Sequence, residues 1–370
     1  MTHILPSLQS LRRGYWFKLI CGASFQHLPT VRSLALAYTL AGADCIDVAA
    51  DPAVIIAVQE ALQIAKTLVS QAQARGFEYT GNSPLLMVSL NDGEDPHFRK
   101  AEFDAAKCPP DCLRPCEKIC PAQAIIFNRR ADDFSGVESQ KCYGCGRCLP
   151  ICPYDIIYTE SHISTPSAIA PLVISTGVDA VEIHTKVGRL AEFEKLWQVI
   201  SPWAEKLKIF AISCPDQEGI VEYLKSIYNL ISPQCQEIIW QTDGRPMSGD
   251  IGDGTTLATV KLGQKILAAN LPGYVQLAGG TNRYTVAKLK AMGLLNCSER
   301  AIKNQPYIAG VAYGSYARRL ISPIIEQLES KEVNHHIQAS IRLEQEPDLL
   351  WQAVELAYSL VSQIKLQQER

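Results

Sequence analysis

The sequence predicts a (β/α)8 barrel into which a cysteine-rich module is inserted. Short apolar runs alternate with longer periodic segments along most of the chain, and eight of the 13 cysteines fall between residues 108 and 152. Alternating strands and helices are typical of a parallel sheet, and eight such units match a closed barrel. An open doubly wound sheet is the alternative that the same alternation allows.

The expected strands are short apolar runs separated by helical segments. They cover Phe17–Gly22, Cys45–Ala50, Leu85–Leu90, Ala180–Thr185, Lys208–Cys214, Glu237–Asp243, Tyr274–Leu277 and Tyr307–Tyr313. Helices are expected between them because apolar residues there recur every three or four positions. After the second strand, Asp51 and Pro52 supply an N-cap and a first helical turn.

The predicted domain boundaries follow from this order. Residues 1–16 are an N-terminal tail, 17–90 the first part of the barrel, 91–162 the cysteine-rich insertion, and 163–370 the rest of the barrel with a C-terminal helix. Because the insertion follows the third strand, we expect it at the C-terminal mouth of the barrel, where barrel active sites lie.

The cysteines fall into two blocks. Residues 142–153 follow the bacterial ferredoxin run C-x2-C-x2-C-x3-C-P, and residues 108–121 have three residues between successive cysteines and also end in Cys-Pro. In two-cluster ferredoxins the fourth cysteine of a run ligates the other cluster. We therefore expect a ferredoxin-like module with two [4Fe-4S] clusters: Cys108, Cys112, Cys116 and Cys152 hold cluster 1, and Cys142, Cys145, Cys148 and Cys120 hold cluster 2.

Structural zinc is the alternative metal, because closely spaced cysteine pairs also bind zinc tetrahedrally. Both blocks continue into apolar runs, at residues 124–127 and 156–158, that are suited to covering a cluster. These runs and the Cys-Pro endings favour iron–sulfur. The wider spacing in the first block leaves the type of its cluster open.

Polar residues lie among the apolar residues of several strands. Because the outer faces of barrel strands pack against helices, period-two alternation predicts that these polar side chains point into the barrel. The candidate catalytic residues are Lys18, Glu182, His184 and Asp243, and the last two are nearest the strand ends. A hydrogen-bonded polar layer that only fills the interior is the alternative, since buried charges must be paired.

Glycine-containing loops follow the last three expected strands. Barrels often bind phosphate with the loops after strands seven and eight. FMN or another phosphate-bearing ligand would therefore contact a candidate set made of Arg245, Gly279, Gly280, Thr281, Gly314 and Ser315. Tight turns would use the same glycines.

Composition excludes some classes of partner. The formal net charge of −3 and a pI near 6.2 give no basic footprint, so nucleic acid is not expected as a partner. The sequence contains no run of 18 apolar residues, so we expect no membrane span. Thirteen cysteines and a start without the layout of a signal peptide predict a reducing compartment, by default the cytoplasm.

The chain resembles the cyanobacterial light-dependent period protein family (LdpA). The resemblance covers nearly the whole chain and rests on the doubled cysteine blocks and on residues 18–24, 47–52 and 240–250. It implies a soluble protein with two iron–sulfur clusters that senses cellular redox state and adjusts the circadian period. The implied partners are redox partners of the photosynthetic electron pool and circadian clock proteins.

Two functions from different classes remain open. In the first, the protein is a redox sensor whose cluster state alters a surface read by a partner. In the second, it is a ferredoxin-type oxidoreductase that passes electrons from the clusters to a flavin or small substrate at the barrel mouth. The resemblance favours the sensor, whereas the polar strand residues and the glycine loops favour the enzyme.

Overall fold

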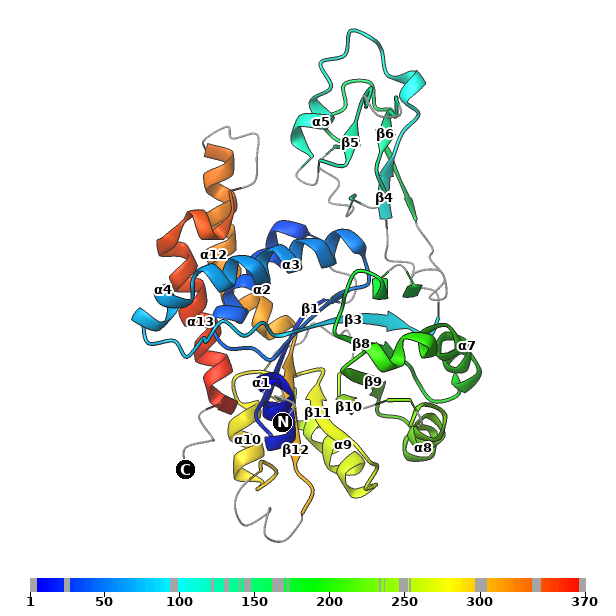
Figure 1. The fold of residues 1–370 in the computed structure, drawn as a ribbon, viewed down its shortest axis with the longest axis vertical. Helices are drawn as coiled ribbons and strands as arrows, with labels where there is room; N and C mark the ends of the chain where they lie inside the picture. Colours follow the sequence, from blue (N-terminus) through cyan, green and yellow to red (C-terminus); the bar gives the residue numbers. More distant parts are fainter. Residues whose placement is uncertain are drawn as a thin grey trace.

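The computed structural model describes residues 5–22, 27–93, 99–120, 123–129, 133–139, 141–142, 148–161, 170–171, 173–232, 234–235, 237–245, 252, 254–296, 305–334 and 341–365. Within them, parallel strands close into a barrel (Figure 1). In chain order these strands are β1 (Trp16–Gly22), β2 (Cys45–Ala49), β3 (Leu85–Asn91), β8 (Ala180–His184), β9 (Ile209–Pro215), β10 (Ile238–Asp243), β11 (Tyr274–Ala278) and β12 (Ile308–Tyr313).

Each barrel strand pairs with its neighbour in the order β1-β12-β11-β10-β9-β8-β3-β2, and β1 also pairs with β2. This closure confirms the predicted barrel and rules out the open doubly wound sheet. The strand bounds agree with the expected runs to within one or two residues, because the apolar stretches themselves form the sheet.

Helices surround the barrel (Figure 1). They are α2 (Leu28–Leu40), α3 (Pro52–Thr67), α4 (Val69–Ala74), α7 (Leu190–Ile200), α8 (Ile220–Ile231), α9 (Thr256–Ala268), α10 (Thr285–Ala291), α12 (Ser315–Asn334) and α13 (Pro347–Lys365), with 3-10 turns at Ser201–Lys206 and Leu343–Gln345. Among these helices none is long and apolar enough to cross a bilayer.

Strand alternation separates two apolar regions. Phe17 faces outward, where its ring stacks on Tyr38 and Tyr313 with centroids 5.9 and 5.2 Å apart. Lys18, the next residue along β1, is fully buried inside the barrel. The period of two residues along a strand produces this division. A smaller apolar cluster, which includes Trp16 and Met87, fills the end of the barrel interior where the strands begin.

The N-terminal segment differs from the predicted tail. Residues Pro6–Arg13 form helix α1, which ends at Gly14 with a φ of +85°. Leu11 of this helix is fully buried and belongs to the same apolar cluster as Trp16. Helix α1 therefore covers the N-terminal end of the barrel.

The cysteine-rich insertion lies between β3 and β8. Strands β4 (Arg99–Glu102) and β7 (Tyr158–Ser161) pair antiparallel and form a ribbon. Beyond this ribbon lie a 3-10 turn (Ala105–Lys107), helix α5 (Pro115–Ile119), and the paired strands β5 (Ile125–Ile126) and β6 (Gly136–Val137). Figure 1 shows these elements gathered beyond the C-terminal ends of the barrel strands.

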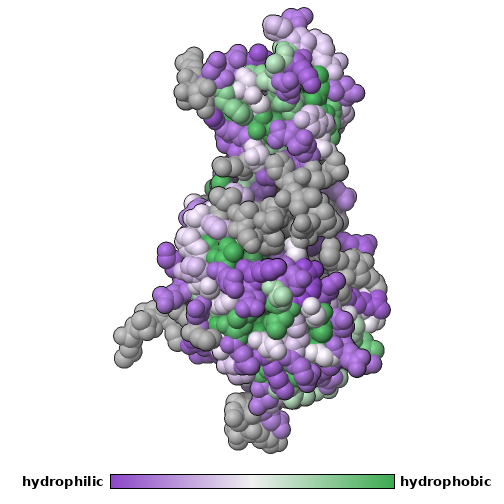
Figure 2. Space-filling model, turned by 90° about the vertical axis from the view of Figure 1, so that its right-hand side faces the viewer, coloured by the Kyte–Doolittle hydropathy of each residue, from purple (hydrophilic) through white to green (hydrophobic). Residues whose placement is uncertain are grey.

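Apolar side chains are exposed on the insertion. In Figure 2 it forms the upper part of the molecule, and its described surface mixes hydrophobic with hydrophilic residues. Leu113 is 85% exposed, and Ile151 and Tyr154 are exposed as well. These three residues lie next to or close to cysteines in the sequence.

Candidate functional site

Seven of the eight predicted ligand cysteines lie in the part of the chain that the structure describes, and Cys145 lies outside it. Three of the seven are buried in a small apolar core of the insertion with Phe103 and Ile157, and four are partly exposed on its edge. The buried set is Cys116, Cys142 and Cys148, and the partly exposed set is Cys108, Cys112, Cys120 and Cys152. Thiols in an apolar core are typical of ligand cysteines in iron–sulfur proteins.

The cysteines assigned to cluster 1 are electrostatic neighbours. Burial raises the pKa of Cys108, and nearby Cys112 and Cys152 raise it further. Burial also raises the pKa of Cys116 to about 11, with contributions from Cys152 and Cys108. Such effects act over short distances, so folding brings Cys152 of the second block to the three cysteines of the first block.

Backbone N–H groups point at three of the cysteine sulfurs. The Ala101 and Arg114 amides donate to the Sγ atoms of Cys142 and Cys112, each at 3.4 Å, and the Ala124 amide donates to Sγ of Cys120 at 3.3 Å. Hydrogen bonds of this kind stabilise thiolates and tune iron–sulfur clusters. The donor set and its surroundings therefore fit a cluster, although no group of three described His, Cys, Asp or Glu side chains could hold a single metal ion.

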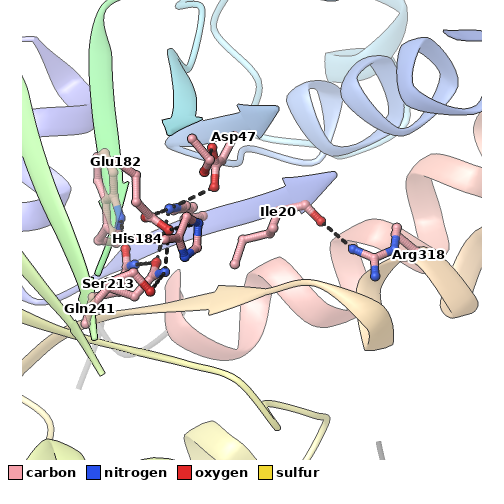
Figure 3. Close-up of polar contacts among 11 residues, drawn as sticks. Ile20, Asp47, Glu182, His184, Ser213, Gln241 and Arg318 are labelled. Atoms are coloured by element: carbon pink, nitrogen blue, oxygen red, sulfur yellow. Dashed lines mark hydrogen bonds and ion pairs between the residues drawn. The ribbon is translucent and has the colours of Figure 1, made fainter. Parts of the chain in front are cut away.

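Inside the barrel, Lys18 is the centre of a buried polar network. Figure 3 shows Asp47, Glu182 and Gln241 of this network. Its Nζ atom forms ion pairs with Glu182 and with Asp47, the latter at 3.0 Å, and it donates to Oε1 of Gln241 at 3.0 Å. The Lys18 side chain is 0% exposed. Strands β1, β2, β8 and β10 each supply one of these groups, so the network depends on barrel closure.

Amide side chains extend the network across the barrel. Nε2 of Gln241 donates to Glu182 at 2.6 Å and to Oγ of Ser213 at 3.1 Å. Oε1 of Gln241 accepts from Nε2 of Gln276 at 2.6 Å, and Gln276 in turn accepts from the Trp16 indole at 2.6 Å. Buried polar groups require such partners.

One buried ammonium group, that of Lys18, faces the two carboxylates of Asp47 and Glu182. Burial alone would lower the pKa of Lys18, but the Asp47 and Glu182 carboxylates raise it above its ordinary value. The amine therefore stays protonated and is unsuited to act as a nucleophile. Burial raises the pKa of Asp47 to about 6, and the Lys18 charge opposes this effect.

At the mouth, His184 and Asp243 follow the buried layer. Nε2 of His184 lies 3.1 Å from Oε1 of Glu182, and the His184 side chain is 29% exposed. Burial raises the pKa of Asp243 to about 6, and the nearby His184 opposes the shift. The structure thus brings Lys18, Glu182, His184 and Asp243 together. A buried carboxylate next to a partly exposed imidazole is an arrangement that can transfer protons.

Packing accounts for the glycines after β11. Gly279 and Gly280 have φ angles of +63° and +91°. A Cβ atom on Gly279 would overlap Oδ1 of Asp243, and one on Gly280 would lie 2.8 Å from the carbonyl oxygen of Thr255. The exposed residue Arg245 contacts the same turn, since its backbone N–H donates to Gly279 O at 3.1 Å. The turn itself therefore needs glycine, and a phosphate ligand at this site stays a prediction.

The other predicted phosphate contacts have partners within the protein. The Thr281 hydroxyl donates to the carbonyl of Ala312 at 2.6 Å. After Gly314, the Ser315 hydroxyl accepts from Arg318 at 3.1 Å, and Arg318 also donates to the carbonyl of Ile20 at 3.0 Å (Figure 3). The sequence reasoning missed Arg318, although a cation one turn into the helix after the last strand was a usable signal.

Comparisons with known proteins agree with this site. Residues 108–163 match the family model "LdpA Fe-S cluster-binding domain", and residues 172–363 match "Light dependent period A C-terminal domain". The chain is 46% identical over 358 residues to "Light dependent period A" of Synechococcus elongatus, which covers 97% of this chain and 93% of that protein.

Other similarities are local or structural. A stretch of 48 residues, 13% of this chain and 29% of the relative, is 45% identical to a probable iron-sulfur protein of the frd operon of Proteus vulgaris. Among solved structures, tryptophan synthase alpha chain from Legionella pneumophila aligns over 100% of both chains with 13% identity and a TM-score of 0.43. The matches over most of the chain show that it belongs to the light dependent period A family and is an iron–sulfur protein with that family's cluster-binding domain.

Proposed function

We propose that this protein is a redox sensor with two [4Fe-4S] clusters. The observation that carries the proposal is the gathering of Cys108, Cys112, Cys116 and Cys152 from two sequence blocks, since crossed ligation is typical of two-cluster ferredoxins. When bound, the clusters would supply one-electron transfer. The chain's own residues hold the thiolates in an apolar core and donate N–H groups to their sulfurs.

The electron donor that we propose for the clusters is a low-potential one-electron carrier of the photosynthetic electron pool. Partly exposed Cys108, Cys112 and Cys152 put cluster 1 nearest the surface, and exposed Leu113 and Tyr154 lie beside it. Electrons would therefore enter at cluster 1. The family's name, "Light dependent period A", supports an output to the circadian period through clock proteins. The described cysteines form no disulfides, and this supports a cytoplasmic location.

The test is a stepwise anaerobic reduction of the purified protein, followed by electron paramagnetic resonance. The proposal expects two successive one-electron reductions, each with its own signal. Capture of clock proteins from a cyanobacterial extract should then differ between the oxidised and reduced forms. Equal capture by both forms would contradict the sensor, and a sample without any reducible centre would contradict the cofactor assignment.

A second candidate is an oxidoreductase that uses the clusters to reduce a flavin or small substrate at the barrel mouth. It is supported by the His184–Glu182 contact, which holds the imidazole at the end of β8 with part of its surface open. Asp243 would serve as the acid partner because burial raises its pKa to about 6. Release of FMN on denaturation would favour the enzyme, with turnover lost in His184→Gln and Asp243→Asn. A colourless supernatant would count against the flavin.

A further inference from the structure

We propose that Lys100 couples cluster 2 electrostatically to the barrel, so that the charge on the cluster and the Lys100–Asp51 ion pair influence each other. This inference rests on the proposed function, because it needs a cluster at Cys142. Lys100 lies in β4, one strand of the ribbon that joins the insertion to the barrel. It is the route by which a redox signal would leave the cysteine module.

On the barrel side, Lys100 pairs with a fixed carboxylate. Its Nζ atom lies 3.1 Å from Oδ2 of Asp51, and the two side chains are only 10% and 2% exposed. Asp51 follows β2, and its Oδ1 accepts the Ala53 amide at 2.8 Å as the N-cap of α3. The carboxylate is therefore held by barrel elements while it binds a residue of the insertion.

On the cysteine side, the same lysine contacts the segment that leads to cluster 2. Its ammonium group donates to the carbonyl oxygen of Ser139, three residues before Cys142. Ala101, the next residue of β4, donates its backbone N–H to Sγ of Cys142 at 3.4 Å. Two successive residues of β4 thus connect Asp51 of the barrel with the Cys142 segment.

Among the charged residues that the structure describes at this junction, Lys100 and Asp51 form a buried pair. Glu138, next to Ser139, pairs with Arg129 and Lys141 at the surface of the insertion. Glu160 stands opposite Lys100 in the β4–β7 register and is exposed. Solvent screens exposed charges, whereas buried pairs are screened much less. The Lys100–Asp51 pair should therefore act on cluster 2 more strongly than these exposed charges do.

Adding one electron to a cluster adds one negative charge. A buried cation nearby stabilises the reduced form and raises the reduction potential, and a buried carboxylate lowers it. Because such coupling is reciprocal, reduction of the cluster must change the free energy of the Lys100–Asp51 ion pair by the same amount. Any ligand that moves the end of β2 would likewise shift the potential of cluster 2.

The test is an anaerobic redox titration of the full-length protein, with the two clusters resolved by electron paramagnetic resonance. Lys100→Met should lower the midpoint potential of cluster 2. Asp51→Asn, which keeps an N-capping side chain, should raise it. The double variant should return toward the wild-type value, and Lys100→Arg should stay close to it. Glu160→Gln, the matched control on the same ribbon, should produce a smaller shift than Asp51→Asn.

Cluster 1 is the internal reference in every sample. Shifts of the same sign in Lys100→Met and Asp51→Asn, or shifts no larger at cluster 2 than at cluster 1, would overturn the coupling. If Lys100→Met fails to fold, the sign of the Asp51→Asn shift still decides. Wild-type protein without iron would instead overturn the proposed function, so the two failures are distinguishable.

Discussion

Nε2 of His184 lies 3.1 Å from Oε1 of Glu182, and this contact joins the mouth of the barrel to its buried interior. The same Glu182 side chain binds Lys18 and Gln241. The His184 imidazole therefore contacts a carboxylate that residues of two other strands, β1 and β10, hold in place. The polar interior is one connected network, in which each charged group depends on its neighbours.

The first prediction concerns the stability of that network. Lys18→Met leaves Asp47 and Glu182 buried without their cation, so we expect a loss of about 3–5 kcal/mol in the free energy of unfolding. Guanidinium unfolding followed by tryptophan fluorescence measures it. The control is Lys265→Met, which removes an exposed pair with Asp216 and should cost no more than about 1 kcal/mol. Equal losses in the two variants would contradict the network.

The second prediction concerns pH. Burial raises the pKa of Asp243 from 3.8 to about 6, so between these values the folded chain holds a proton that the unfolded chain has lost. The contribution of Asp243 to the free energy of unfolding therefore falls as pH rises from about 4 to about 6. Asp243→Asn removes this pH-dependent loss of stability, because the amide side chain does not ionise.

We expect Asp243→Asn to be more stable than the wild type by about 1–3 kcal/mol at pH 8, and the difference should shrink toward zero at pH 4. Chemical unfolding at a series of pH values measures it. Asp216→Asn, at a side chain 55% exposed, is the control and should show little pH dependence. A stability difference for Asp243→Asn that is constant with pH would contradict the raised pKa.

A third prediction separates crowding from backbone strain at the turn after β11. Gly279→Ala adds a methyl group that overlaps Asp243, at a φ of +63°. Gly177→Ala adds one at a φ of +83° with nothing within 4 Å. Both substitutions should lose about 1–3 kcal/mol of stability through backbone strain. Gly279→Ala should lose more than Gly177→Ala, because its methyl group must also displace Asp243. Thermal unfolding compares them, and similar midpoints for both variants would argue against the close packing.

Fourth, the crossed ligand assignment predicts which cluster each cysteine serves. Cys152→Ser should remove the signal of cluster 1 and leave that of cluster 2, because Cys152 lies beside Cys108 and Cys116. Cys120→Ser should do the reverse. Cys235→Ser, at a partly exposed cysteine of the barrel, should keep full iron content. Loss of cluster 2 in Cys152→Ser would show that each block binds its own cluster.

The barrel could be predicted from the sequence because its strands are apolar runs with regular alternation. The inward direction of Lys18 and Glu182 followed from the same alternation. The β4–β7 ribbon could not be predicted, because its residues are largely polar and the two strands pair across more than fifty intervening residues. The contact of Lys100 with Asp51 depends on that pairing, so no local sequence pattern predicts the contact.

Helix α1 was missed for a related reason. It is short and polar on average, and contacts with residues far away in the sequence fix it in place, such as the Arg12–Glu237 ion pair and the packing of Leu11 at the end of the barrel. The network partners were hidden in the same way, since Trp16 and Gln276 are separated by 260 positions yet share a hydrogen bond. Contacts between distant strands become visible only once the barrel closes.

We expect thiolates from the two cysteine blocks to hold two cubane clusters. Iron and acid-labile sulfide analysis of anaerobically purified protein tests it most directly. We expect about eight iron and eight sulfide atoms per chain, as two [4Fe-4S] clusters require. Zinc in place of iron, or a chain without metal, would contradict it.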